Sequence, residues 1–181
     1  IKAVPIMAAI GVQTEDRVRA KELVKAGANV LLIDVAHGHH KNVIDMVKWC
    51  KEQPEFVDVD IIAGNIATTE AAIDLENAGA DGLRVGIGGG SLCTTRIKTG
   101  FGVPNVTSLE DVVSEAKTPV MADGGIRTSG DMAKALALGA STIMIGSLIA
   151  GTDESPGQIL ETPKGLYKRY RGSASLETKV T

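Results

Sequence analysis

A single cysteine at the end of a glycine-rich loop is the feature of this sequence best suited to covalent chemistry. The apolar run that begins at Gly82 leads into the loop GIGGG at 86–90 and then to Cys93. A thiolate is a strong nucleophile near neutral pH when its pKa is lowered, and backbone N–H groups beside a basic residue such as Arg96 can lower it. Glycines adopt positive φ angles and let the backbone approach a small ligand or ion closely. The pattern predicts a nucleophile beside a small-molecule site.

The composition indicates a globular protein of the cytosol. The 181 residues are 44% hydrophobic and 23% charged, which suits one catalytic domain over 1–181 with a sizeable core. The net charge of −3 provides no broad basic surface for nucleic acid or an anionic membrane. No apolar run approaches the ~20 residues of a membrane span. The two cysteines, Cys50 and Cys93, lack CxxC spacing and fit a reducing compartment.

Apolar runs alternate with helical patterns along the chain. The expected strands are 6–12, 29–36, 59–64, 82–87, 120–123 and 141–145. The expected helices are 14–27, 42–52, 69–77 and 129–138. Aromatic residues make up only 3% of the chain, and the abundance of Ala, Val, Ile and Leu suits strands that are buried on both faces. The alternation predicts parallel βαβ units in an α/β fold.

Polar or glycine-rich residues follow most of these strands, at Asp34, Asn65, 123–125 and 146–147. In a (β/α)₈ TIM barrel the carboxyl ends of all strands face one rim, which holds the active site. The interval from 82 to 120 is the longest, and its extra residues include Cys93, as expected of an active-site insertion. A closed barrel needs eight strands and about six βα units are evident, so we expect two N-terminal strands to lie outside this sequence. The alternative is an open doubly wound sheet.

The cysteine loop and several further motifs resemble the IMP dehydrogenase and GMP reductase family. GIGGGSLCTTR at 86–96 is similar to the family's active-site loop, usually GIGPGSICTTR, with Gly89 in place of the usual Pro or Ser. The other blocks match in order: DVAHGH at 34–39, IIAGNIAT at 61–68, ADGGIRTSGD at 122–131, MIGSLIAGTDESPG at 144–157 and YKRYRG at 167–172. The resemblance covers nearly the whole chain and implies a TIM-barrel oxidoreductase.

The resemblance implies a purine nucleotide substrate. Cys93 would attack C2 of the purine while a hydride passes between that carbon and a nicotinamide. Thr95 matches the threonine that helps to activate water in the dehydrogenases and takes part in the ammonia chemistry of the reductases. Asp123 matches the carboxylate that takes both ribose hydroxyls. The other residues implied to bind the substrate, several of them at its 5′-phosphate, are Ser91, Gly125, Gly146, Ser147, Tyr170 and Gly172.

The resemblance also implies a dinucleotide cofactor, which is NAD in a dehydrogenase and NADP in a reductase. The residues that match positions beside the nicotinamide ribose and the reacting cysteine are Asp34, Asn65 and Arg84. The backbone carbonyls that match the K⁺ site of IMP dehydrogenases belong to Gly88, Gly90 and Cys93. A homotetramer is implied in the same way.

The late part of the chain carries the residues that distinguish the two activities. Dehydrogenases commonly read YRGMGSL before a flap with an Arg-Tyr pair, and many reductases read GSASE with a catalytic glutamate. This chain reads YRGSASLET at 170–178: GSAS matches the reductases, but Glu177 stands one residue later and Leu176 is dehydrogenase-like. IKTGFG at 97–102 favours the reductases, and GVPNVTSLEDV at 102–112 favours the dehydrogenases. The flap pair would lie beyond Thr181. We expect an IMP dehydrogenase that makes XMP, with GMP reductase as the alternative.

Functions of other classes remain open on the residues alone. A barrel epimerase or synthase with a phosphorylated substrate would share the glycine-rich phosphate signature, but it would not need Cys93. A non-catalytic nucleotide-binding module would share the signature as well, and it would not need an intact nucleophile loop.

Overall fold

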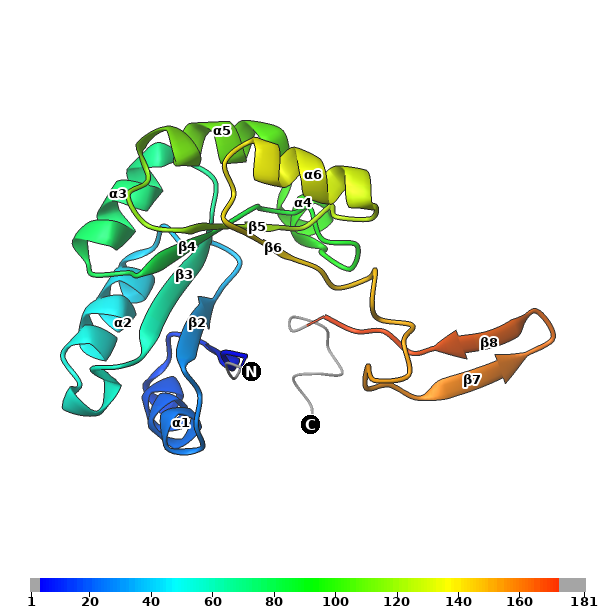
Figure 1. Ribbon diagram of the computed structural model, residues 1–181, viewed down its shortest axis with the longest axis horizontal. Helices are drawn as coiled ribbons and strands as arrows, with labels where there is room; N and C mark the ends of the chain where they lie inside the picture. Colours follow the sequence, from blue (N-terminus) through cyan, green and yellow to red (C-terminus); the bar gives the residue numbers. More distant parts are fainter. Residues whose placement is uncertain (1–3, 173–181) are drawn as a thin grey trace.

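Six parallel strands form the centre of the structure. The computed structural model describes residues 4–172. The strands pair in chain order from β1 to β6, and every pairing is parallel. The sheet curves into a half-barrel (Figure 1). The strand bounds are β1 Met7–Ile10, β2 Val30–Asp34, β3 Asp60–Ile66, β4 Gly82–Val85, β5 Val120–Asp123 and β6 Thr142–Met144.

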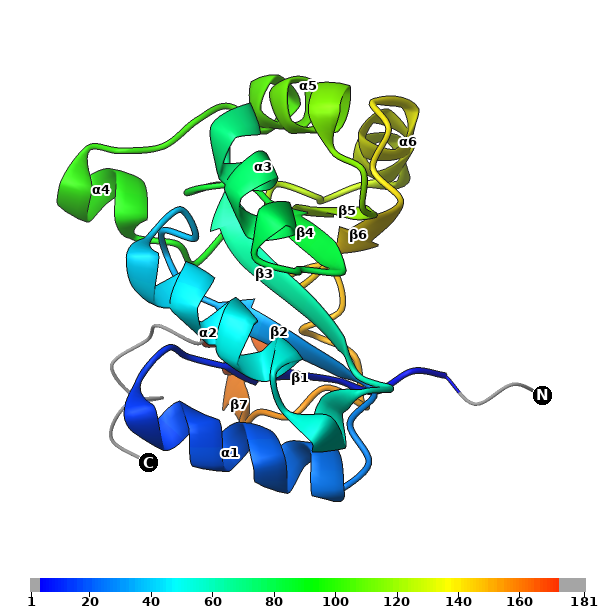
Figure 2. The ribbon, with the colours of Figure 1, turned by 90° about the vertical axis from the view of Figure 1, so that its left-hand side faces the viewer.

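A helix connects each strand to the next, as parallel pairing requires. The main helices are α1 Thr14–Lys25, α2 Lys41–Lys51, α3 Thr69–Asn77, α5 Asn105–Glu115 and α6 Ser129–Ala137. They follow the outer, convex side of the sheet in Figure 1, and Figure 2 shows α1, α2 and α3 over the same face of the strands. Within residues 4–172, none of the helices combines the length and the apolar character that crossing a membrane requires.

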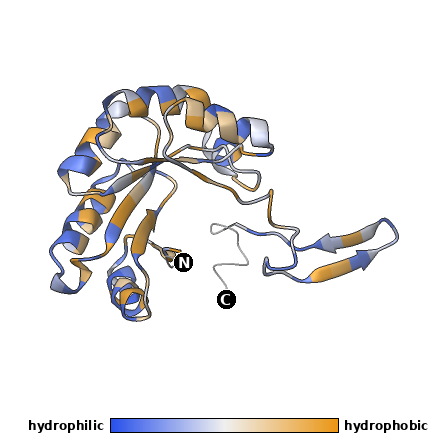
Figure 3. Cartoon of the chain, viewed as in Figure 1, coloured by the Kyte–Doolittle hydropathy of each residue, from blue (hydrophilic) through white to orange (hydrophobic). Residues whose placement is uncertain are grey.

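The core lies between the sheet and its outer helices. Consecutive aliphatic residues of β2, such as Leu31 and Leu32, are both buried although they point to opposite faces. On α2 the buried positions 43, 46, 47 and 50 recur at helical spacing and form a stripe against the sheet. In Figure 3 most of β2 and β3 is accordingly orange, the colour of hydrophobic residues. Burying each large aliphatic side chain contributes about 1.5–3 kcal/mol to the stability of the fold. This packing holds the strands, and therefore the residues at their ends, in place.

The predicted α/β class and TIM-barrel arrangement are confirmed. All six strands fall within or close to the expected ranges, and α3 has the expected bounds. The strand order excludes the alternative of a doubly wound sheet, because in that fold the order reverses at a switch point.

The sequence did not predict α5 or several short elements. The short elements are the 3₁₀ turn Pro54–Phe56, the helix α4 Thr95–Thr99 and the hairpin of β7 Ile159–Thr162 and β8 Gly165–Lys168. The hairpin extends away from the half-barrel in Figure 1, and nearly all of its residues are exposed, so it lacks the alternation of buried and exposed residues that marks a strand. The Nζ of Lys168 anchors the hairpin base by donating to the carbonyls of Thr152 and Ser155, at 2.5 and 2.7 Å.

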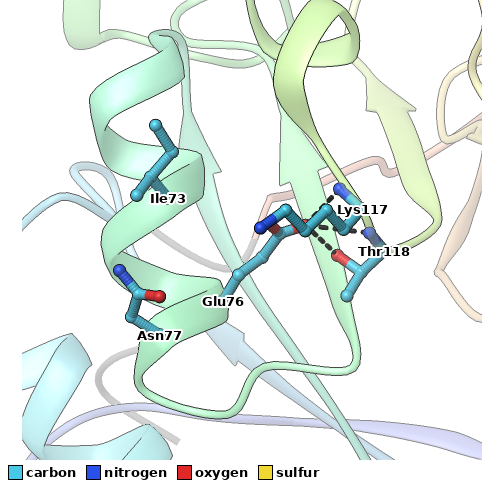
Figure 4. A pocket seen from close by; sticks show the side chains of 5 residues that line it. All are labelled: Ile73, Glu76, Asn77, Lys117 and Thr118. Atoms are coloured by element: carbon cyan, nitrogen blue, oxygen red, sulfur yellow. Dashed lines mark hydrogen bonds between the residues drawn. The ribbon is translucent and has the colours of Figure 1, made fainter.

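Glu76 on α3 holds the segment that leads into β5. One carboxylate oxygen, Oε1, accepts hydrogen bonds from the backbone N–H groups of Lys117 and Thr118, at 2.7 and 2.8 Å, and from the Thr118 hydroxyl at 2.8 Å. Figure 4 shows these bonds beside Ile73 and Asn77, which line the same small cavity of about 250 Å³. The position of β5 therefore depends on a side chain of the outer helix layer.

We expect Glu76→Ala to lower the free energy of unfolding by about 1–3 kcal/mol, because two backbone N–H groups and a hydroxyl lose their acceptor. Chemical denaturation of the full-length protein measures this change. Glu70→Ala, on the exposed side of the same helix, is the matched control and should change stability by about 0.5 kcal/mol or less. Equal effects of the two substitutions would show that the Glu76 contacts do not contribute to stability.

Candidate active site

Polar side chains from four neighbouring strands form one network at the carboxyl edge of the sheet. Asp34 ends β2, Asn65 lies near the end of β3, Arg84 lies in β4, and Asp123 ends β5. Arg84 Nη1 donates to Asp34 Oδ1 at 2.6 Å, and its Nε and Nη2 lie 3.1 and 3.0 Å from Asp123 Oδ2. Asn65 Nδ2 donates to the same Asp123 oxygen at 2.8 Å. Three residues expected near a cofactor and one expected at a ribose thus contact one another directly.

Arg84 is the centre of this network. Its side chain is only 11% exposed, and those of Asp34 and Asp123 are 23% and 21% exposed. Removing a guanidinium from water is costly unless carboxylates satisfy it, and the planar fork of arginine can bond two of them at once. Two carboxylates around one guanidinium leave one excess negative charge at the edge of the sheet. Such a group suits hydroxyl donors, including those of a sugar.

Asp123 keeps one carboxylate oxygen for a ligand. Both Arg84 and Asn65 bond to Oδ2. Within the part of the chain that the structure describes, Oδ1 has no hydrogen-bond partner, and the carboxylate is partly exposed. The network therefore fixes the orientation of Asp123 while leaving an acceptor toward the site.

Cys93 and Thr95 lie together beyond β4. The thiol of Cys93 donates to Thr95 Oγ1 at 3.2 Å, and the backbone N–H of Cys93 donates to the carbonyl of Gly90 at 3.1 Å. The thiol is partly exposed, and Thr95 is the first residue of α4. If the thiol loses its proton, the threonine hydroxyl can donate to the sulfur in return. The two residues expected to be catalytic are thus neighbours in space as well as in sequence.

Arg96 holds the cysteine loop together. Its Nη2 donates to the carbonyls of Ile87 and Val103, which lie before and after the cysteine, at 3.3 and 3.0 Å. A Cβ at Gly88 would lie 2.6 Å from Arg96 Cγ, and Gly88 has a φ of +80°, so this contact requires glycine. The sequence suggested that Arg96 acts on the thiol. In the structure its guanidinium bonds to the loop backbone, and an effect of its charge on Cys93 stays a prediction.

The cysteine loop lies directly against the turn that follows β5. A Cβ at Gly86 would lie 2.0 Å from the carbonyl oxygen of Asp123, and one at Gly124 would lie 2.9 Å from the carbonyl carbon of Gly89. Only bare backbone permits this approach. The loop that carries the nucleophile and the turn that carries Gly125, an expected phosphate-binding residue, are therefore adjacent.

Three of the remaining residues expected to bind substrate, Gly146, Ser147 and Tyr170, lie along or against the same edge. Met144 of β6 pairs with Asp123, so the residues after β6, Gly146 and Ser147, follow the same edge as the turn after β5. A Cβ at Gly146 would lie 2.8 Å from the Tyr170 hydroxyl oxygen, which places these two predicted residues in contact. Ser91 is exposed in the cysteine loop, and Gly172 is half-buried. Their contact with a nucleotide stays a prediction, and Leu176 and Glu177 lie outside the described residues.

Two of the histidines near β2, His39 and His40, have hydrogen-bond partners in the structure. His39 Nε2 lies 2.9 Å from Asp74 Oδ2, and His40 Nδ1 accepts the backbone N–H of Asn42 at the start of α2. Between residues 4 and 172, no group of three or more His, Cys, Asp or Glu side chains could hold a metal ion.

Sequence reasoning missed Asn105, the first residue of α5. Its side-chain amide lies between the cysteine loop and the turn after β5, and Nδ2 donates to the carbonyl of Gly124 at 2.5 Å. The sequence offered no helix-start signal here, because a typical start has Asn at the N-cap and Pro after it, whereas Pro104 precedes Asn105.

We expect iodoacetamide to label Cys93 in the native protein and to leave Cys50 unmodified. Cys50 is fully buried in the core, and burial raises the pKa of its thiol to about 12, so little thiolate forms and the reagent has no access. Peptide mass spectrometry before and after unfolding in denaturant measures both sites. Labelling of Cys50 at a similar rate in the native state would contradict the described core.

Comparisons with known proteins identify the family of this chain. The model of the "IMP dehydrogenase / GMP reductase domain" family matches residues 2–181. The chain is 52% identical to GMP reductase of Leishmania major over 177 residues, which is 96% of this chain and 36% of that protein. It is 53% identical to inosine-5′-monophosphate dehydrogenase of Methanocaldococcus jannaschii over 161 residues, 87% of this chain and 32% of that protein.

Among solved structures, a variant of GMP reductase from Trypanosoma brucei in complex with guanosine 5′-monophosphate has a TM-score of 0.95 and 47% sequence identity. The match covers 98% of this chain and 38% of that one. The chain thus spans a little over a third of the length of this structure and about a third of the two relatives above. The family model covers almost every residue, including the cysteine loop and the four-strand network, and the chain belongs to the IMP dehydrogenase / GMP reductase family.

Proposed function

We propose that this chain carries the nucleotide site and nucleophile of an IMP dehydrogenase, which oxidises IMP to XMP with NAD⁺. The observation that carries the proposal is the pairing of Cys93 with Thr95 on a loop packed against the Asp123 turn. A nucleophile, a hydroxyl beside it and a ribose acceptor are the groups that this reaction needs within the length of one nucleotide. An epimerase, a synthase or a simple binding module would leave the cysteine without a task.

In this proposal the nucleotide lies across the edge from β4 to β6. Asp123 Oδ1 accepts from the ribose hydroxyls, because its other oxygen is already held by Arg84 and Asn65. The 5′-phosphate lies among Ser91, Gly125, Gly146 and Ser147, where backbone N–H groups and hydroxyls can bind an anion in a protein of net charge −3. The hydroxyl of Tyr170, which lies against Gly146, adds a donor at the same place. The structure of the Trypanosoma relative with a bound purine nucleotide supports this choice of substrate class.

In this proposal the reaction at Cys93 has two steps, adduct formation with hydride transfer and hydrolysis of the adduct. The thiolate forms a bond to C2 of IMP, and the C2–H bond breaks as the hydrogen passes with its electron pair, as hydride, to the nicotinamide of NAD⁺, which leaves C2 bound to sulfur as a thioimidate. Water then adds to C2, the C–S bond breaks, and XMP leaves as the thiolate returns to Cys93. The water oxygen becomes the C2 carbonyl, so the water gives up both protons: one ends on N3 of XMP and the other is released. Thr95 Oγ1 is the hydroxyl that would orient that water and pass the released proton on.

The donor sets present fit a dinucleotide and a cation. NAD⁺, when bound, supplies the hydride acceptor. Asp34, a part-exposed carboxylate fixed by Arg84, suits a ribose hydroxyl of the cofactor, with Arg84 and Asn65 between it and the substrate. The carbonyls of Gly88, Gly90 and Cys93 would hold K⁺, since backbone carbonyls of a glycine loop are the ligands that this ion prefers. An oligomer, expected to be a homotetramer, is part of the same proposal.

GMP reductase is the second candidate, because several observations favour it. The sequence GSAS at 172–175 matches the reductases, and relatives and a solved structure of that name are as similar as the dehydrogenases. In that reaction Cys93 would again form the adduct at C2, ammonia would leave GMP, and NADPH would supply the hydride. We favour the dehydrogenase because Glu177 stands one residue later than the reductase glutamate and Leu176 is dehydrogenase-like.

We expect Cys93→Ser to lower turnover by far more than tenfold, because a hydroxyl is a much poorer nucleophile than a thiolate at neutral pH. IMP should still bind, since the two side chains have similar sizes, and calorimetric titration measures this affinity. Cys50→Ala is the matched control, because it removes the other thiol far from the site. If Cys93→Ser retains more than about a tenth of the wild-type rate, Cys93 does not form the covalent adduct.

The direction of the chemistry can be read from absorbance at 340 nm with the full-length protein. Given IMP and NAD⁺, it should produce XMP and NADH, and the rate should rise when K⁺ replaces a bulky organic cation, because K⁺ would order the cysteine loop. Given GMP and NADPH, it should leave the absorbance unchanged. Loss of NADPH with GMP, together with no XMP from IMP, would replace the dehydrogenase by the reductase. No reaction with either pair would contradict both.

A further inference from the structure

The side chain of Asn105 bonds to the turn that carries the ribose carboxylate. Asn105 begins α5, directly after Pro104. Its Nδ2 donates to the backbone carbonyls of Gly124 and Asp123, at 2.5 and 3.3 Å. Asp123 is the last residue of β5, and Gly124 is the first residue of the turn that follows it. The side chain therefore joins this turn to the connection that follows the cysteine loop.

The cysteine loop packs against the same amide. A Cβ added at Gly89 would lie 2.7 Å from Asn105 Nδ2 and 2.8 Å from Oδ1, so the bare backbone of Gly89 touches the side chain. A Cβ at Gly86 would lie 3.7 Å from Oδ1. Asn105, Gly89 and the turn at 124–125 also line a cavity of about 450 Å³. One side chain is thus shared by the loop that carries the nucleophile and the turn that carries the ribose acceptor.

The oxygen of this amide is buried and has no donor. Within residues 4–172, no group donates to Asn105 Oδ1. Two carbonyl oxygens face the other atom of the amide, which identifies that atom as the nitrogen and directs the oxygen to the cysteine loop. A buried acceptor without a donor destabilises a fold, so its presence needs a reason. A backbone N–H of the glycine loop would satisfy Oδ1 if the loop moved toward it.

We propose that Asn105 is a positioning residue, which holds the Cys93 loop in register with Asp123 and accepts a loop N–H when the loop closes on the nucleotide. This inference rests on the proposed function. Asn105 acts through the loop backbone and contacts neither the thiol nor the carboxylate side chain. Misplacing a reacting group by 1 Å can lower the rate by about a hundredfold. Loss of Asn105 should therefore lower kcat much more than nucleotide affinity.

Asn105→Leu in the full-length protein tests the proposal, because leucine keeps the size of the side chain and removes both donor and acceptor. Asn105→Asp keeps the acceptor and removes the donor. It is the variant to measure if Asn105→Leu does not fold. Asn42→Leu is the control, since Asn42 is exposed in the first turn of α2. We expect kcat to fall by about tenfold or more and the KM for nucleotide to change by less than about threefold. The yield of nucleotide adduct on Cys93 in acid-quenched single turnovers should fall with kcat, and the control should match wild type.

Hydrogen exchange provides a second readout that needs no turnover. Exchange over 86–93 should be at least about threefold faster in the Asn105 variants than in wild type, because the loop loses its support. The proposal is overturned if kcat stays within about twofold of wild type, or if the loss appears only in KM. If wild type neither turns over nor forms an adduct, the proposed function fails, and exchange alone decides: faster loop exchange supports the positioning role, and unchanged exchange overturns it.

Discussion

The ion pairs of Arg84 with Asp34 and Asp123 are the interactions on which the site depends. They connect the ends of β2, β4 and β5, and Asn65 adds β3 through its bond to the same carboxylate. Because Arg84 is almost buried, removing either carboxylate would leave guanidinium N–H groups without an acceptor in a place with little water. The network therefore fixes each carboxylate in one orientation, which a site for ribose hydroxyls requires. The residues expected to bind the substrate ribose and the residues expected to bind the cofactor therefore belong to one network of ion pairs and hydrogen bonds.

Elements outside the site keep this unit in place. The buried strands fix the register, so that the polar residues at their carboxyl ends meet at one edge. Glu76 holds the entry to β5 from the outer helices, and Arg96 joins the two ends of the cysteine loop. Glycines at 86 and 124 then allow the cysteine loop to touch the turn after β5. Core packing thus determines how far the nucleophile lies from the ribose acceptor.

Much of this arrangement could be predicted from the sequence, because the strands are apolar runs and the polar residues follow them directly. The pairing of Cys93 with Thr95 is also a consequence of local spacing. Arg84 was harder, since nothing local shows that one arginine lies between carboxylates 50 and 39 positions away. Asn105 was missed because its contacts are with backbone carbonyls, which have no signature in the side-chain sequence. The hairpin at 159–168 is exposed on both faces and lacks the alternation that reveals a strand.

A crystal structure of the full-length protein with IMP bound would test the central claim that the four-strand network and the cysteine loop form one nucleotide site. The account predicts the ribose hydroxyls on Asp123 Oδ1, the phosphate between the turns after β5 and β6, and C2 of the purine facing the Cys93 sulfur. It also predicts that Arg84 keeps both of its carboxylate partners when the nucleotide is bound. A nucleotide elsewhere on the protein, or one whose ribose points away from Asp123, would contradict it.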